Sequence, residues 1–166
     1  MTMGVEIERK FLVKSDADFK KKAESAVELR QGYLSEAPEA TVRVRIAAQK
    51  AFITVKSRNK GISRGEWEYE IPYRDAEELL SLPGVRSLHK TRYVVSSHGH
   101  RWEVDEFHGP LEGLVMAEVE LTRVDEPVEL PDFIDREVTG DPRYYNSNLV
   151  RDKSGDVPVP SRQGEG

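Results

Sequence analysis

The 166-residue chain alternates apolar and charged residues with a period of two over much of its length. Such alternation is typical of β-strands that have one polar and one apolar face. It predicts eight strands, placed at residues 5–13, 30–34, 41–47, 52–57, 65–72, 87–96, 101–107 and 114–124. Most connections between them are short, which favours antiparallel pairing because parallel neighbours need long crossover connections.

Helices are the minority. Ser15 followed by Asp18 resembles a capping box, and apolar residues at helical spacing come after it, so a helix is predicted over about 16–27. Asp75 is expected to cap a second short helix that ends ahead of Pro83. The expected class is therefore mainly β, with a few short helices.

The length predicts one domain, which we place at residues 1–151. Residues 152–166 are rich in Pro, Gly and charge and poor in large apolar side chains, which predicts a disordered tail. No stretch approaches ~18 consecutive apolar residues, so no membrane partner is expected. The first residues lack the features of a secretory signal, so the cytoplasm is the expected location.

Charge is abundant and nearly balanced. Charged residues make up 33% of the chain, but 25 Lys and Arg against 30 Asp and Glu leave a net charge of −5. This acidic balance argues against nucleic acid as a partner. There is no cysteine, which excludes disulfides, thiolate nucleophiles and cysteine-ligated metals.

Nearly every polar-face position in the predicted strands is ionised. Charges of like sign recur two residues apart, roughly 6.5–7 Å on one face, as at Arg43 and Arg45 or at Glu118 and Glu120. A solvated sheet face is the simpler explanation of alternating charge, but like-charge neighbours cost stability there. We therefore expect external counter-charges, which are divalent cations for the acidic rows and a polyanion for the basic rows. The sixteen positions are Glu6, Glu8, Lys10, Arg43, Arg45, Lys56, Glu66, Glu68, Glu70, Lys90, Arg92, Arg101, Glu103, Asp105, Glu118 and Glu120.

Convergence of these faces predicts a closed eight-stranded antiparallel β-barrel, or tunnel, with a charged lumen. About eight strands enclose a lumen that holds side chains or one small ligand. The apolar faces then point outward, where the short helices partly cover them. So many charges cannot lie in a dry interior, so the lumen must contain water or a ligand.

Ordered sequence blocks resemble the CYTH domain family, the triphosphate tunnel metalloenzymes. Residues 6–10 match its Glu-x-Glu-x-Lys signature, and blocks such as Thr-Val-Arg-Val-Arg at 41–45 and Ala-Glu-Val-Glu-Leu at 117–121 follow in the family's order. The resemblance extends to about residue 149 and is closest to short bacterial inorganic triphosphatases. It implies a tunnel in which triphosphates are hydrolysed or rearranged with Mg²⁺ or Mn²⁺. Residues 144–146 resemble a segment that closes one tunnel mouth.

Candidate roles follow from side-chain chemistry and from this resemblance. Carboxylates suit hard divalent cations, so the expected metal ligands are Glu6, Glu8, Asp105, Glu118 and Glu120; cross-strand ion pairing is the alternative. Guanidinium and ammonium groups suit phosphate oxygens, so the expected substrate contacts are Lys10, Arg43, Arg45, Lys56, Lys90 and Arg92. The expected catalytic residues are Lys10, Glu8 and Glu68. The resemblance implies that Lys10 contacts the terminal phosphate or orients water, and which of Glu66, Glu68 and Glu70 acts stays open.

The leading functional prediction is metal-dependent hydrolysis of inorganic tripolyphosphate to pyrophosphate and phosphate. Adenylate cyclase activity on ATP and thiamine triphosphate hydrolysis are alternatives in the same tunnel. A polyphosphate- or nucleotide-binding sensor is the non-enzymatic alternative, but binding a polyanion alone would not require two sets of carboxylates. The expected partner is a small-molecule triphosphate, and the protein is expected to be a monomer or a homodimer.

Overall fold

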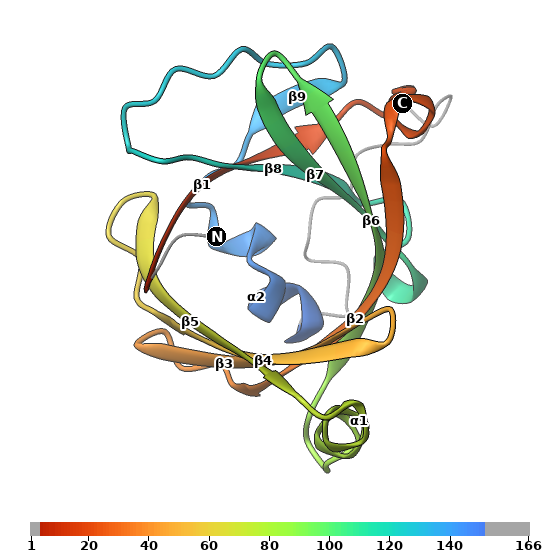
Figure 1. Ribbon diagram of the computed structural model, residues 1–166, viewed down its shortest axis with the longest axis vertical. Helices are drawn as coiled ribbons and strands as arrows, with labels where there is room; N and C mark the ends of the chain where they lie inside the picture. The colour runs from red at the N-terminus through yellow and green to blue at the C-terminus, as the bar shows by residue number, and fades with distance from the viewer. Residues whose placement is uncertain (1–3, 152–166) are drawn as a thin grey trace.

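One antiparallel sheet forms the body of the protein in the computed structural model, which describes residues 4–151. Its strands are β1 (Gly4–Val13), β2 (Ser25–Ser35), β3 (Ala40–Ala47), β4 (Lys50–Ser57), β5 (Ser63–Ile71), β6 (Ser87–Ser97), β7 (His100–Phe107), β8 (Val115–Glu120) and β9 (Ile134–Glu137). The order is β5-β4-β3-β2-β6-β7-β8-β1, and a β1–β5 pairing closes it into a barrel, seen end-on in Figure 1. The predicted closed eight-stranded antiparallel barrel is confirmed.

Strand β9 was not predicted. It pairs with β1 through Phe11 and Val13, beyond the point where β5 leaves the same edge of β1. The segment 134–137 has the sequence Ile-Asp-Arg-Glu, in which a single apolar residue gives no alternation to detect. Its position is set by the free edge of β1, so it extends the wall without belonging to the closed ring.

The predicted helix over 16–27 is wrong. The chain forms a single 3-10 turn, η1 (Phe19–Lys22), and β2 begins at Ser25, five residues before the predicted strand. From Ser25 onward β2 pairs with β6, and from Leu29 it also pairs with β3. These ladder hydrogen bonds and the burial of Leu29 outweigh a weak local preference for helix.

The last predicted strand, 114–124, is shorter in the structure, because β8 ends at Glu120. Leu121 still donates its backbone N–H to the carbonyl of Ile7 at 2.7 Å. At the next residue the Glu126 carboxylate accepts hydrogen bonds from both the N–H and the hydroxyl of Thr122. The chain therefore turns away from the barrel wall there.

Helix α1 (Tyr73–Leu80) confirms the second predicted helix, but its N-cap is Pro72, and Asp75 lies within the first turn. Its buried residues Ala76 and Leu80 pack against the outer faces of β3 and β4. The remaining short elements are η2 (Gly109–Leu111), η3 (Pro142–Tyr144) and α2 (Asn146–Arg151). In the part of the chain that the structure describes, no helix is long and apolar enough to cross a membrane.

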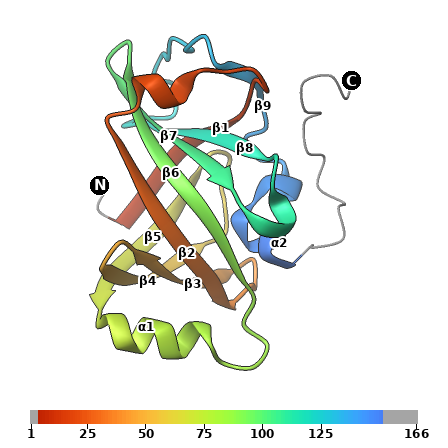
Figure 2. The same cartoon turned by 90° about the vertical axis from the view of Figure 1, so that its right-hand side faces the viewer.

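Helix α2 is not an outer helix, as the sequence had suggested for the helices. It lies inside the outline of the barrel in Figure 1 and at one end of it in Figure 2. There Tyr144 and Leu149 pack with Leu12, Phe107 and Met116 in one buried cluster. Leu12 and Met116 share strand parity with Lys10 and Glu118, so they face the lumen. The lumen is therefore apolar at the end that α2 closes, and charged over the rest.

The predicted tail, residues 152–166, lies outside the described residues.

Candidate active site

A cavity of about 290 Å³ occupies the charged part of the lumen. It has room for about ten water molecules at ~30 Å³ each, which agrees with the expectation of a wet or ligand-filled interior. Its charged lining comprises Glu6, Glu8, Lys10, Arg43, Arg45, Lys56, Arg64, Glu66, Glu68, Arg92, Arg101, Glu103, Glu118 and Glu120. Of the sixteen predicted inward charges, Glu70, Lys90 and Asp105 are not among the lining residues.

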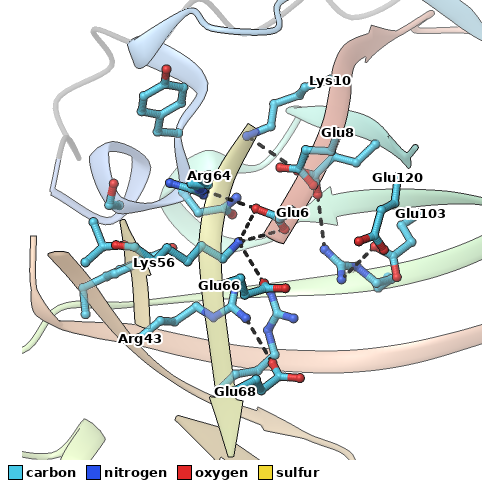
Figure 3. A pocket seen from close by; sticks show the side chains of 18 of the residues that line it. Glu6, Glu8, Lys10, Arg43, Lys56, Arg64, Glu66, Glu68, Glu103 and Glu120 are labelled. Atoms are coloured by element: carbon cyan, nitrogen blue, oxygen red, sulfur yellow. Dashed lines mark hydrogen bonds and ion pairs between the residues drawn. The ribbon is translucent and has the colours of Figure 1, made fainter. Parts of the chain in front are cut away.

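Strand register brings the acidic residues together. Glu8 lies opposite Glu120 in the β1–β8 ladder, and Glu118 lies opposite Glu103 in the β7–β8 ladder. Figure 3 shows Glu8, Glu103 and Glu120 together, and it shows Glu66 and Glu68 beside Lys56 and Arg43. Carboxylates and basic groups therefore alternate around one cavity, although each strand carries mostly one sign of charge.

Repulsion from neighbouring carboxylates outweighs attraction from the lysines at Glu8. Burial raises the pKa of this carboxyl well above its usual range, and the neighbouring charges of Glu118 and Glu6 raise it further. Burial also opposes ionisation of Glu118, but Lys10 and Arg92, with nitrogens 3.7 and 3.5 Å from its oxygens, lower its pKa to about 2. A cation bound beside Glu8 would relieve this repulsion.

Arg43 and Arg45 carry like charges that lie close together. Arg43 donates to the Thr54 hydroxyl at 3.2 Å and lies 3.7 Å from Glu68, while its buried Nε has no hydrogen-bond partner within residues 4–151. Arg45 donates to the side-chain oxygen of Gln31 at 2.8 Å. Burial, and then the charge of Arg43, lowers the pKa of Arg45 to about 9. An anion in the cavity would offset this repulsion.

Lys56 and Arg64 both contact Glu6. The Lys56 Nζ donates to the two Glu6 oxygens at 3.0 and 3.1 Å and lies 3.5 Å from Glu66, and the Arg64 Nε donates to Glu6 Oε1 at 3.3 Å. Arg64 was missed by the sequence prediction, because the strand was started at residue 65 and not at Ser63. The alternation that includes Glu66 extends back to residue 64 and could have found it.

Residues 144–147, which precede and begin α2, contact Lys10 at one end of the cavity. The Lys10 Nζ donates to the backbone carbonyl of Tyr144 at 3.1 Å and lies 5.7 Å from the centre of the Tyr145 ring. Tyr145, Asn146 and Ser147 line the cavity. This contact places the residues before and at the start of α2 beside the ammonium group that the sequence assigned to the terminal phosphate.

Asp105 and Lys90 form a buried ion pair behind the cavity lining. Asp105 Oδ1 accepts from Arg92 Nε at 2.7 Å, and Oδ2 accepts from Arg92 Nη2 at 2.8 Å and lies 2.7 Å from the Lys90 Nζ. Lys90 also donates to Asn146 at 3.0 Å. Burial alone would raise the pKa of Asp105, but the two cations hold it well below its usual range. Both oxygens of this carboxylate therefore already have cationic partners.

The carboxylate donor set fits a hard divalent cation. Within residues 4–151, the tunnel carboxylates do not form a group of three whose ligand atoms lie within 4.8 Å of one another. Glu6 instead pairs with Lys56, and Glu118 pairs with Lys10 and Arg92. Mg²⁺ does not require such a cage, since it usually binds one or two carboxylates and completes its shell with water and substrate phosphates.

Comparison with known proteins agrees with this geometry. The sequence model of the CYTH domain matches residues 4–145. The chain belongs to the CYTH family. Membership in this family of tunnel metalloenzymes implies a divalent metal, and the matched residues span all the strands of the barrel.

Relatives with assigned names span nearly the same length as this CYTH protein. A protein of Acetivibrio thermocellus named inorganic triphosphatase is 49% identical over 150 residues, which is 90% of this chain and 95% of that protein. One of Nitrosomonas europaea with the same name is 39% identical, over 87% of this chain and 96% of that protein. A crystal structure of an inorganic triphosphatase superposes with a TM-score of 0.62 at 35% identity, covering 94% of this chain and 100% of the other.

Proposed function

We propose that this protein hydrolyses inorganic tripolyphosphate to pyrophosphate and phosphate inside the barrel. The observation that carries the proposal is that carboxylates and guanidinium and ammonium groups line the same cavity. A polyanion alone would need only the basic groups, and a cation alone would need only the carboxylates. A triphosphate bound together with a divalent cation needs both. The names of the relatives, inorganic triphosphatase, point to the same substrate.

Arg43, Arg45, Lys56 and Arg92 are assigned to the substrate phosphates. The planar guanidinium groups can donate two parallel hydrogen bonds to phosphate oxygens, and Lys56 supplies a compact charge. Phosphoryl transfer depends mostly on positioning and on neutralising charge on the phosphoryl oxygens. Lys10, at the end closed by α2, is assigned to the terminal phosphate.

Glu6, Glu8, Glu118 and Glu120 would hold the metal, for which we propose Mg²⁺ or Mn²⁺. When bound, such an ion supplies positive charge to the phosphates and makes a nearby water more acidic. Glu68 contacts Arg43 and accepts a hydrogen bond from Thr54 at 2.9 Å. We therefore assign Glu68 a positioning role, in which it orients Arg43 toward the substrate.

Asp105 and Lys90 are also assigned positioning roles. Asp105, expected from the sequence as a metal ligand, holds the Arg92 guanidinium in place through two hydrogen bonds. Lys90, expected as a substrate contact, links Asp105 to Asn146 at the start of α2. Together they would fix Arg92 and the closed end of the tunnel relative to each other.

Product analysis tests the proposal. The purified protein is incubated with tripolyphosphate, ATP, thiamine triphosphate and pyrophosphate, each with Mg²⁺, with Mn²⁺ and with EDTA. Equal amounts of pyrophosphate and phosphate from tripolyphosphate, lost in EDTA, are expected. Cyclic AMP from ATP, or preferential hydrolysis of thiamine triphosphate, would replace the proposed reaction, and tight binding of tripolyphosphate without turnover would identify a sensor.

Matched variants test the residue assignments. Glu8→Gln and Arg43→Ala should each lower kcat/KM by at least about a hundredfold, as is typical when a group that stabilises transition-state charge is removed. Arg123→Ala and Glu129→Gln remove the same types of charge from exposed positions outside the cavity and should leave activity unchanged. Wild-type activity in folded Glu8→Gln or Arg43→Ala would contradict the assigned site.

The cytoplasmic location, and the monomeric or homodimeric state, stay predictions from the sequence.

A further inference from the structure

Three metal-ligating side chains gather on the outside of the barrel, away from the tunnel cavity. Glu28 on β2, His89 on β6 and His108 just after β7 each place one ligand atom within 4.8 Å of the other two. Strands β2 and β6 lie side by side toward the viewer in Figure 2. The group lines a separate surface cavity of about 540 Å³, and none of the three lines the tunnel.

The backbone fixes the spacing of this group. In the β2–β6 ladder, Glu28 lies opposite Thr91, and Arg30 lies opposite His89. The backbone N–H of His108 donates to the carbonyl of His89 at 3.0 Å, which holds the end of β7 beside β6. The sheet register therefore brings Glu28 near His89, and the backbone hydrogen bond brings His108 beside them.

Their side chains already contact one another. The Nε2 of His89 lies 2.5 Å from Oε1 of Glu28, and the two imidazole rings are 4.9 Å apart. The Thr91 hydroxyl donates to Oε2 of Glu28 at 2.8 Å and lies 2.7 Å from Nε2 of His108. The Thr91 hydroxyl therefore bridges the Glu28 carboxylate and the His108 ring.

We propose that Glu28, His89 and His108 form a second metal site, which binds Zn²⁺ through one carboxylate oxygen and two imidazole nitrogens. Imidazole suits Zn²⁺, whereas Mg²⁺ prefers oxygen ligands. In a tetrahedral zinc site with bonds of ~2.0–2.1 Å, the ligand atoms lie about 3.3 Å apart. The ligand atoms lie within 4.8 Å of one another, so modest side-chain movements would bring them to this spacing. Because all three residues line the surface cavity, water could supply the fourth ligand.

The site lies on the reverse side of the wall that carries the buried ion pair. His89 and Thr91 flank Lys90 on β6, and the side chain of Lys90 points inward to Asp105. Zinc bound outside ties β2, β6 and the end of β7 together at this level of the barrel. It acts as a structural cross-link of the tunnel wall, independent of the proposed hydrolysis.

Calorimetric titration of the full-length, EDTA-treated protein with ZnCl₂ tests the site. Excess Mg²⁺ is included so that the tunnel carboxylates are occupied. One Zn²⁺ per chain is expected to bind and to raise the melting temperature. His89→Ala and His108→Ala should weaken binding by at least about tenfold, while His98→Ala, a histidine on the β6–β7 turn, is the matched control and should not. With Co²⁺ as a probe, the visible absorption of a low-coordinate site should appear in the wild type and disappear in His89→Ala.

Melting without zinc and turnover of tripolyphosphate separate loss of the zinc site from loss of the fold or of the tunnel activity. His89→Ala should retain wild-type melting without zinc, because this side chain is exposed, and should retain wild-type turnover of tripolyphosphate with Mg²⁺. Absence of zinc binding in excess Mg²⁺, or equal affinity in the wild type and both histidine variants, would overturn the proposal. Loss of zinc binding in Glu8→Gln alone would place the ion in the tunnel and would overturn it as well.

Discussion

The buried carboxylate of Asp105 gives the sharpest test of how the tunnel wall is built. Asp105 is 2% exposed and Lys90 is fully buried, so neither charge is solvated by bulk water. Asp105→Asn keeps the shape of the side chain but removes the anion that Lys90 and Arg92 share. Arg92 and Lys90, whose pKa burial already lowers to about 7, then remain close together without a full counter-charge.

The expected cost is large. Removing one partner of a buried ion pair destabilises a protein by about 3–5 kcal/mol, because the remaining charge is left uncompensated. In a chain of this size each kcal/mol shifts the melting temperature by roughly 2–4 °C, so Asp105→Asn should lower it by roughly 6–20 °C. The urea midpoint should fall by roughly 1.5–2.5 M for an m-value near ~2 kcal/mol/M.

A double-mutant cycle separates this role from metal ligation. Lys90→Met added to Asp105→Asn removes one of the cations that lost its counter-charge, so the double variant should be more stable than the sum of the two single effects predicts. Thermal and urea unfolding are measured, without metal, for the wild type, the two single variants and the double variant. If Asp105 were instead a metal ligand, Asp105→Asn would leave the metal-free protein as stable as the wild type. If Asp105→Asn lowers the melting temperature by less than about 3 °C, or if its effect on stability simply adds to that of Lys90→Met, the ion-pair role is refuted.

Three further changes have defined outcomes. Glu8→Gln should raise the melting temperature of the metal-free protein at pH 7, because the pKa of Glu8 is raised in the folded state and its ionised form destabilises the fold. This increase in melting temperature should vanish below pH 4.5, where the Glu8 carboxyl is protonated in the folded and the unfolded state. Gly32→Ala should lower stability by about 1–3 kcal/mol in urea unfolding, because the added Cβ would lie 2.8 Å from the carbonyl oxygen of Arg86. Glu126→Gln should lower the urea midpoint at pH 7, but this loss should shrink as pH falls from 4.5 toward the lowered folded pKa of about 2, where the wild type loses the same charge. An unchanged difference from the wild type across these pH ranges would contradict the two glutamate assignments.

Much of the candidate site could be predicted from the sequence because strand geometry is simple. Side chains alternate between two faces, so ionised residues at every second position had to share a face. Closure of eight strands then brought those faces together around one lumen, as at Glu8 and Glu120. Arg64 was missing from the predicted set because the strand was predicted to begin at residue 65, two residues after the true start of β5 at Ser63.

The errors have a common origin in long-range pairing. Residues 25–27 have a local helical pattern, yet they pair with β6, more than sixty residues away in the chain. Strand β9 has almost no pattern of its own and is defined by the free edge of β1. The local sequence could not indicate either partner.

What the sequence determined by itself was the class of fold, the sign of each lumen charge and the family resemblance, because all three depend on residue types at short, regular spacings. Tertiary structure alone decided which charges reach the cavity. Asp105 and Lys90 share the predicted polar face with Glu103 and Arg92, but they lie closer to the end filled by α2, where apolar packing excludes water and leaves them to neutralise each other. The same holds for Glu28, His89 and His108, which meet only because β2 pairs with β6 and the end of β7 is hydrogen-bonded to β6.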